Sequence, residues 1–146
     1  MSGKNQSPPV FNWQSTSPVT GFLPLNNNTQ GKGSVPSGFL DGAMSGTNTI
    51  YSQILDLSRM DNFGLEVNYN YDATGTASGV FQVMGSNSGV YFYALTFNPA
   101  LGQPAGSPGG YLVDLNQFPF KYLMLQYTNT TGTGVLIVYG QQKDLN

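Results

Sequence analysis

Apolar and polar residues alternate along residues 63–71, where large apolar side chains are separated by small or polar ones. A period of two is the signature of a β-strand with one buried face. Further strands are expected at residues 78–85 and 90–97, and the Ser, Asn and Gly residues at positions 86–89 suit a tight hairpin turn between them. The pattern therefore predicts three consecutive strands in the middle of the chain.

Two apolar runs precede this stretch, at residues 39–44 and 49–57. The second run is ambiguous, since its apolar residues also fit one face of a short helix. Its Thr, Ile and Tyr residues and its shortness favour a strand. Residues 58–62 are compatible with a single helical turn.

A long loop at residues 98–110 is rich in proline and glycine, which predicts a segment that is either functional or mobile. A short strand is expected at residues 111–115. A final hairpin is expected to pair residues 120–127 with residues 135–139. Short strands joined by turns, without a convincing long helix, predict an all-β fold, namely a jelly-roll-like antiparallel β-sandwich.

This final hairpin is apolar on both faces. Leu123, Leu125 and Tyr127 are expected to face the core together with Leu136 and Val138. The opposite face would then carry five apolar or aromatic residues: Tyr122, Met124, Val135, Ile137 and Tyr139. Because a solvated sheet face should be polar, this second face is expected to be covered either by the N-terminal part of the chain or by another subunit.

Residues 1–38 are polar and interrupted by prolines. The sequence therefore predicts an extended N-terminal arm at residues 1–38, ahead of a β-sandwich domain at residues 39–146. The arm is expected either to stay loose with an edge strand or to dock its short apolar islands on a neighbouring subunit. The hypothetical subunit interface comprises Trp13, Phe22, Leu23, Tyr122, Met124, Val135, Ile137 and Tyr139.

Only 8% of the 146 residues are charged, and the formal net charge is −2. So few charges give little electrostatic protection against association, which favours a chain covered by neighbours in an assembly over a turn-rich β monomer. The absence of Cys excludes disulfides and thiol catalysis, and the absence of His removes the usual general base and zinc ligand. We therefore expect no cofactor and no enzymatic activity.

The first residues lack the apolar segment of a signal peptide, and no apolar run approaches the roughly 20 residues of a membrane span. We expect neither export by a standard signal nor membrane insertion. The Lys and Arg residues form no patch, and the acidic isoelectric point of about 4.5 argues against direct contact with nucleic acid.

The carboxylates are scattered singly, so their spacing predicts neither an acid–base pair nor a calcium loop. Residues 31–34 lack the spacing of a phosphate-binding loop. Exposed tyrosines and amides suit a sugar-binding face instead, and the candidates are Tyr91, Tyr93, Asn87 and Gln103. The alternative for the tyrosines is cross-strand aromatic packing.

Five motifs occur in this order: Phe63-Gly-Leu-Glu-Val67, Ser78-Gly-Val-Phe-Gln-Val-Met-Gly-Ser-Asn87, Gly109-Gly-Tyr-Leu-Val-Asp-Leu115, Pro119-Phe-Lys-Tyr-Leu-Met-Leu-Gln-Tyr127 and Thr131-Gly-Thr-Gly-Val135. Over residues 49–145 this order resembles small β-sandwich virion proteins of bacteriophages. The chain departs from that pattern at Phe92, where tryptophan is common, and at Met124, where a basic residue is common. The first departure weakens a sugar-stacking role at Phe92, and the second fits a covered outer face.

The resemblance implies a structural virion component assembled in the host cytoplasm: a capsid decoration or cement protein, a minor capsid protein or the head of a short spike. Its partners would be copies of itself, as a homotrimer, and other capsid proteins. The alternative is a carbohydrate- or receptor-binding module of a spike or fibre that binds a host surface glycan. A hydrolase built on the scattered carboxylates is a third alternative.

Overall fold

The fold is taken from a computed structural model that describes residues 9–18, 25, 40, 42–57, 62–70, 74–116 and 118–143, without the side chains of residues 142 and 143. These residues form strands and turns and no helix. In chain order the strands are β1 (Trp13–Gln14), β2 (Ala43–Met44), β3 (Thr49–Ser52), β4 (Leu55–Asp56), β5 (Asn62–Tyr69), β6 (Ser78–Ser86), β7 (Tyr93–Ala94), β8 (Gly109–Asp114), β9 (Tyr122–Thr131) and β10 (Gly134–Lys143).

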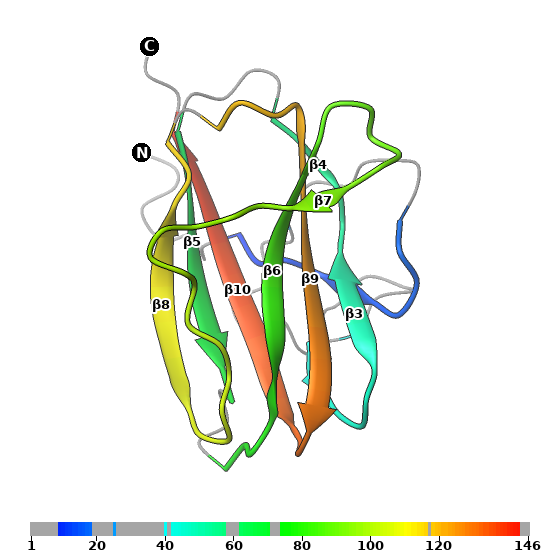
Figure 1. The fold of residues 1–146 in the computed structure, drawn as a ribbon, viewed down its shortest axis with the longest axis vertical. Helices are drawn as coiled ribbons and strands as arrows, with labels where there is room; N and C mark the ends of the chain where they lie inside the picture. Colours follow the sequence, from blue (N-terminus) through cyan, green and yellow to red (C-terminus); the bar gives the residue numbers. More distant parts are fainter. Residues whose placement is uncertain are drawn as a thin grey trace, which may run out of the picture.

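The strands form two antiparallel sheets (Figure 1). The four-stranded sheet has the order β2-β10-β5-β8, and the six-stranded sheet has the order β1-β3-β9-β6-β7, with β4 also pairing with β9. Apart from β1 and β4, this is the order of a jelly roll. The last strand, β10, lies between β2 and β5 in one sheet. The strand before it, β9, lies between β3 and β6 in the other. The fold class predicted from the alternating pattern is confirmed.

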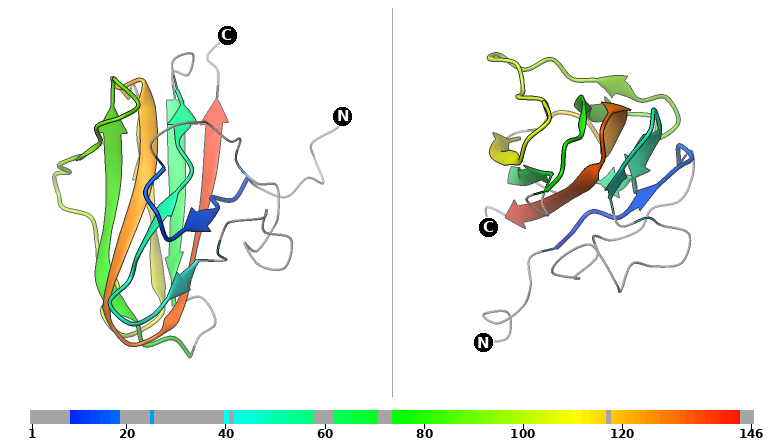
Figure 2. Two further views of the ribbon diagram at one scale, coloured as in Figure 1. Left: turned by 90° about the vertical axis from the view of Figure 1, so that its right-hand side faces the viewer. Right: turned by 90° about the horizontal axis from the view of Figure 1, so that it is seen from below.

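The core lies between the two sheets, which Figure 2 shows as two layers. On β5, Phe63, Leu65 and Val67 are buried while Glu66 between them is exposed. The inward-facing residues of β9 and β10 are those expected, because Leu123, Leu125, Tyr127, Leu136 and Val138 all belong to this core. Each such side chain contributes about 1.5–3 kcal/mol through burial.

The predicted final hairpin is wrong, because β9 and β10 lie in different sheets. β9 pairs with β3, β4 and β6, whereas β10 pairs with β2 and β5. Gly132, with a φ of 75°, turns the chain from one sheet to the other. Alternation determines which face of a strand is buried, but it does not determine the partner strand.

The strand expected at residues 90–97 is shorter than predicted, since β7 comprises only Tyr93–Ala94. The Ser88 hydroxyl accepts hydrogen bonds from the N–H groups of Val90 and Tyr91, both at 3.1 Å. These bonds hold the chain in a turn where a strand was expected. A single helical turn at residues 58–62 lies largely outside the described residues, and Asn62 begins β5.

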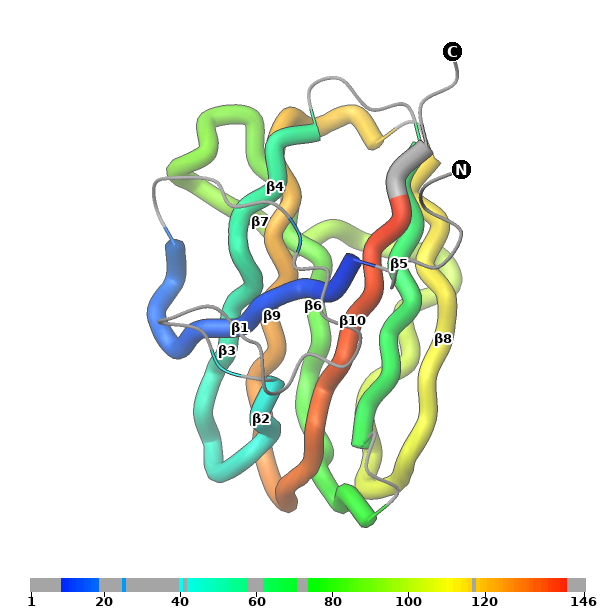
Figure 3. Tube along the Cα trace, turned by 180° about the vertical axis from the view of Figure 1, so that it is seen from behind, coloured from blue at the N-terminus to red at the C-terminus, as the bar shows by residue number. Residues whose placement is uncertain are grey.

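The N-terminal segment joins the two sheets (blue in Figure 3). Val10 forms an antiparallel bridge with Tyr139 in one sheet, and Trp13 pairs with Ser52 in the other. Phe11 and Trp13 belong to the core. The described part of the predicted arm thus packs into its own sandwich, while Phe22, Leu23 and the boundary at residue 38 lie outside the described residues.

Asn70 directly follows β5, at the start of the connection that crosses to β6, and it lies against Gly134, where β10 begins after crossing from β9. The Asn70 side-chain amide donates to the carbonyl oxygens of Ala77 at 3.0 Å and Ser107 at 2.9 Å, and its oxygen accepts from the N–H of Ala77 at 2.9 Å. Next to it, the N–H of Thr76 donates to the carbonyl oxygen of Thr133 at 2.7 Å. Asn70 therefore fixes how β5 passes to β6 beside the passage from β9 to β10.

The free edge of β6 is covered by the loop that follows β7. Gln103 accepts a hydrogen bond from the N–H of Phe81 and donates to its carbonyl oxygen at 3.1 Å. Leu95 and Pro104 add backbone hydrogen bonds to Val83 and Gly79 on either side. A covered edge cannot pair with another chain.

Gln103→Ala is expected to lower the free energy of unfolding by about 1–2 kcal/mol, because the Phe81 backbone loses both partners. Urea unfolding measures this change. Gln103→Glu is the matched variant: it keeps the acceptor for the N–H but places a carboxylate against the carbonyl oxygen, so it should also destabilise. If both variants unfold like the parent, Gln103 does not hold this edge.

Candidate contact surfaces

Residues 86–93, from the last residue of β6 to the first residue of β7, form a turn fixed by serine side chains, and we call it the tyrosine turn. The Ser86 hydroxyl accepts from the N–H of Gly89 at 2.9 Å and lies 3.3 Å from the Ser88 hydroxyl. Gly89 has a φ of 78°, where a side chain is strained. The turn is therefore held in shape before it meets any partner.

The tyrosine turn presents apolar and aromatic side chains to solvent. Val90 is 50% exposed, Tyr91 68% and Tyr93 71%. Tyrosine gives a large contact area with only two side-chain torsions to fix, which makes it effective at protein and glycan interfaces. The sequence-based expectation of an accessible surface at Tyr91 and Tyr93 agrees with these exposures.

The two amides predicted to share this surface have structural partners. The Asn87 side-chain oxygen accepts from the backbone N–H of Lys121 at 3.1 Å, which ties the turn to the start of β9. Gln103 is bound to the β6 edge. The structure therefore does not assemble Tyr91, Tyr93, Asn87 and Gln103 into one set of ligand-binding groups.

Three of the eight residues of the hypothetical subunit interface are buried within the chain itself. Trp13 and Ile137 are each 1% exposed and Met124 is 2% exposed. Met124 packs with Ile54 and Met84 in a second cluster on the outer side of the six-stranded sheet. Tyr122, Val135 and Tyr139 are half-buried. The residues packed on Met124, among them Ile54 and Phe92, belong to neither of the two covers predicted for this face.

Ile137→Lys is expected to lower the free energy of unfolding by about 2–4 kcal/mol, because the ammonium would replace an apolar side chain at a buried position. Val135→Lys is the control, since Val135 lies on the same face of β10 and is only half-buried. Chemical unfolding of both variants gives the comparison. Equal losses of unfolding free energy in the two variants would show that Ile137 is no better buried than Val135.

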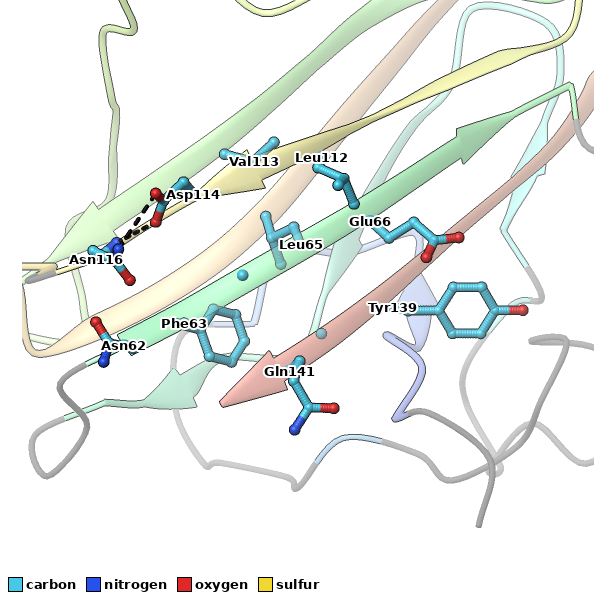
Figure 4. A pocket seen from close by; sticks show the side chains of 12 residues that line it. Asn62, Phe63, Leu65, Glu66, Leu112, Val113, Asp114, Asn116, Tyr139 and Gln141 are labelled. Atoms are coloured by element: carbon cyan, nitrogen blue, oxygen red, sulfur yellow. Dashed lines mark hydrogen bonds between the residues drawn. The ribbon is translucent and has the colours of Figure 1, made fainter. Parts of the chain in front are cut away.

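The outer face of the four-stranded sheet contains a hollow of about 540 Å³ that the sequence did not reveal (Figure 4). Gly64 forms part of its floor, and the β-ladder places Gly64 between Asp114 on β8 and Gln141 on β10. One row further along, Glu66 lies between Leu112 and Tyr139. The only signal of this hollow in the sequence was Gly64, a glycine at an outward-facing position of an alternating strand.

The polar groups of this sheet hollow are carboxylates, amides and a tyrosine. Both carboxylates are oriented by neighbouring amides. Asp114 accepts from the N–H and side-chain amide of Asn116 at 3.0 and 3.3 Å, and Glu66 accepts from the side-chain amide of Asn68 at 3.0 Å. Leu112 beside them is 79% exposed. Such a mixture suits a ligand that has both hydroxyl groups and apolar faces.

Among the described residues, no group of three or more acidic, His or Cys side chains is placed to hold a metal ion. In the same part of the chain, no helix is long and apolar enough to cross a membrane.

Two tyrosines, the buried Tyr127 and the half-buried Tyr111, have raised pKa values. Burial raises the pKa of Tyr127 to about 12, and its hydroxyl donates to the side-chain oxygen of Asn129 at 2.8 Å. Burial, and then the proximity of Tyr69, raise the pKa of Tyr111. Both shifts favour the neutral phenol in the folded state.

The stability of the fold is therefore expected to fall as pH rises from about 10 towards 12. Tyr127 keeps its proton in the folded state at pH values where the unfolded chain loses it, so its contribution is complete below pH 10 and is lost as pH passes 12. Urea unfolding across this range measures the slope. Tyr127→Phe should have a shallower slope, and identical slopes for parent and variant would contradict the assignment.

Comparisons with known proteins assign no family to this chain. No family model matches it. No curated protein matches it either. A cleaved adhesin domain of Lys-gingipain from Porphyromonas gingivalis is similar in structure at a TM-score of 0.31 and 16% sequence identity, over 99% of this chain and 87% of that one. A TM-score this low carries no argument about fold or function.

Proposed function

We propose that this chain is a structural virion protein of a bacteriophage, of the capsid decoration or minor capsid type. The jelly-roll order of the strands supports this, because double-sheet jelly rolls recur in viral capsid and lectin domains. That support is an analogy at the level of the fold, and a fold alone does not specify a function. The resemblance of the strand and turn motifs to phage virion proteins points the same way.

The observation that carries the proposal is the tyrosine turn. Its exposed side chains Val90, Tyr91 and Tyr93 lie on a backbone already fixed by Ser86 and Ser88. A pre-organised surface loses little conformational entropy when it binds, so most of its contact energy becomes affinity. We assign this turn as the surface that attaches the sandwich to a neighbouring virion protein.

The charge distribution agrees with permanent attachment. Among residues with described side chains, the charged ones are Asp56, Glu66, Asp114 and Lys121, and none belongs to the tyrosine turn. A turn that carries exposed aromatic residues and no charge of its own has the composition of an interface core, and Lys121 lies at its margin, where its N–H bonds Asn87. The homotrimer and the contacts with other capsid proteins implied by the resemblance remain predictions.

The test replaces both exposed tyrosines in the phage that encodes this chain. Tyr91→Ala with Tyr93→Ala should lower incorporation into purified particles by at least about tenfold, since each ring is a candidate hot spot of about 2 kcal/mol. Tyr91→Phe with Tyr93→Phe keeps both rings and should incorporate well. Unchanged incorporation of the alanine variant, with its fold intact by circular dichroism, would refute the attachment surface.

The sheet hollow favours a second candidate, a glycan-binding module on the virion surface. Its carboxylates and amides match sugar hydroxyls, and Leu112 and Tyr139 match the apolar face of a sugar ring. Gly64→Thr would fill the floor at little structural cost, because a Cβ there meets only the carbonyl oxygen of Val113 at 3.7 Å. Loss of glycan-array binding in this variant supports this role. An absence of binding by the parent chain rejects it.

A further inference from the structure

The edge strand β8 has a regular pattern of hydrogen bonds to β5. The N–H of Leu115, just after β8, donates to the carbonyl oxygen of Phe63 at 2.9 Å. In an antiparallel ladder, hydrogen-bonded pairs alternate with pairs that do not bond. In the observed register, Val113 pairs with Leu65 and Tyr111 pairs with Val67, so these two residues direct their backbone groups toward β5.

The intervening residues Gly110, Leu112 and Asp114 therefore direct their N–H and carbonyl groups away from β5, toward the open edge of the sheet. No backbone hydrogen bond from these groups to another segment occurs in the described part of the chain. All three residues are exposed. Three donors and three acceptors thus face solvent in one row.

The other long edge of the sandwich is treated differently. The loop after β7 and the side chain of Gln103 cover the β6 edge. β8, with the sequence GGYLVD, has neither the Lys nor the Pro that commonly protects an open edge. Leu112, the central residue of the exposed row, is 79% exposed.

We propose that the β8 edge pairs with the β8 edge of a second copy of this chain. The two strands would run antiparallel about a two-fold axis at Leu112. Leu112 would then exchange both backbone hydrogen bonds with the second copy's Leu112, and Gly110 of each copy would pair with Asp114 of the other. The two four-stranded sheets become one continuous sheet across the axis.

The side chains agree with this register. Each Leu112 side chain lies on the outer face and would contact Leu112 of the second copy across the axis. This contact would remove from water the most exposed large apolar residue of the described chain. Each Asp114 lies opposite a glycine, so the carboxylates do not face one another. Each carboxylate is already bonded to Asn116 of its own chain. The row is thus self-complementary, which is what a two-fold contact requires.

This contact does not rest on the proposed virion role, and it is an alternative to the homotrimer that the resemblance implies. Hydrogen exchange with sedimentation tests it on the full chain. Sedimentation equilibrium should show a reversible dimer. As the dimer forms, the amides of Gly110, Leu112 and Asp114 should become protected, while those of Tyr111 and Val113 should be protected at every concentration. A monomer or trimer at all concentrations would overturn the proposal, as would a dimer in which the first three amides stay unprotected.

A charged residue at the axis tests the same contact. Leu112→Lys would place two ammonium groups opposite each other and should weaken dimerisation on the order of 100-fold. Val80→Lys is the matched control, since Val80 is 44% exposed on β6, away from this edge, and its dimer should form normally. A Leu112→Lys chain that dimerises like the parent would overturn the proposal. If it fails to fold, the exchange pattern of the parent still decides.

Discussion

Asn70→Ala is expected to lower the free energy of unfolding by about 3–5 kcal/mol, measured by urea unfolding. The Asn70 side chain is fully buried, and it bonds both backbone groups of Ala77 and the carbonyl oxygen of Ser107. Alanine would leave these groups without partners inside the corner. Alanine also tolerates the φ of 54° at this position less well than asparagine, whose short polar side chain forms local hydrogen bonds there.

Asn70→Gly separates the two causes, because glycine accepts the positive φ but makes none of the side-chain bonds. Asn70→Gly should lower the free energy of unfolding by about 1 kcal/mol less than Asn70→Ala does. It should still be clearly less stable than the parent. If glycine restored parental stability, backbone strain alone would explain the alanine result. The assignment of Asn70 as a hydrogen-bonding hub would then be wrong.

Gly42→Ala is expected to lower the free energy of unfolding by about 3 kcal/mol or more. Gly42 has a φ of 80°, and a Cβ there would overlap the carbonyl oxygen of Leu136 in β10. That backbone cannot move away easily, because the N–H of Leu136 donates to the carbonyl oxygen of Gly42 at 2.8 Å. Chemical unfolding measures the loss.

Gly46→Ala is the matched control for this clash. Gly46 also has a positive φ, of 56°, but a Cβ there would approach only the side-chain amide of Asn48, at 3.9 Å. It should therefore show the backbone strain alone, about 1–2 kcal/mol. Equal losses at the two positions would mean that the approach of Gly42 to β10 is not tight.

The period of two along the chain predicted the buried face of each long strand, because the pleat alone determines which side chains point inward. Leu123, Leu125 and Tyr127 face the core as expected. The partner of a strand is a long-range property. Because β9 and β10 are separated by only a short glycine-containing turn, the sequence resembled a hairpin, although the turn passes from one sheet to the other.

The candidate surfaces were predictable to the extent that they depend on residue type. Tyr91 and Tyr93 were expected to be accessible, and they are. Nothing near Gln103 in the sequence indicates that its amide reaches Phe81, and nothing near Trp13 indicates that the ring lies in the core of its own chain. The sheet hollow escaped prediction because its residues come from three strands brought together only by the sheet order.

The proposed function makes this chain a structural part of a phage particle. Quantitative mass spectrometry of purified particles tests it most directly, combined with a particle map into which the jelly roll can be placed. A virion role predicts a fixed ratio of this chain to the major capsid subunit, with density for the sandwich attached through the tyrosine turn. Particles that are complete and infectious but lack the chain would contradict the claim.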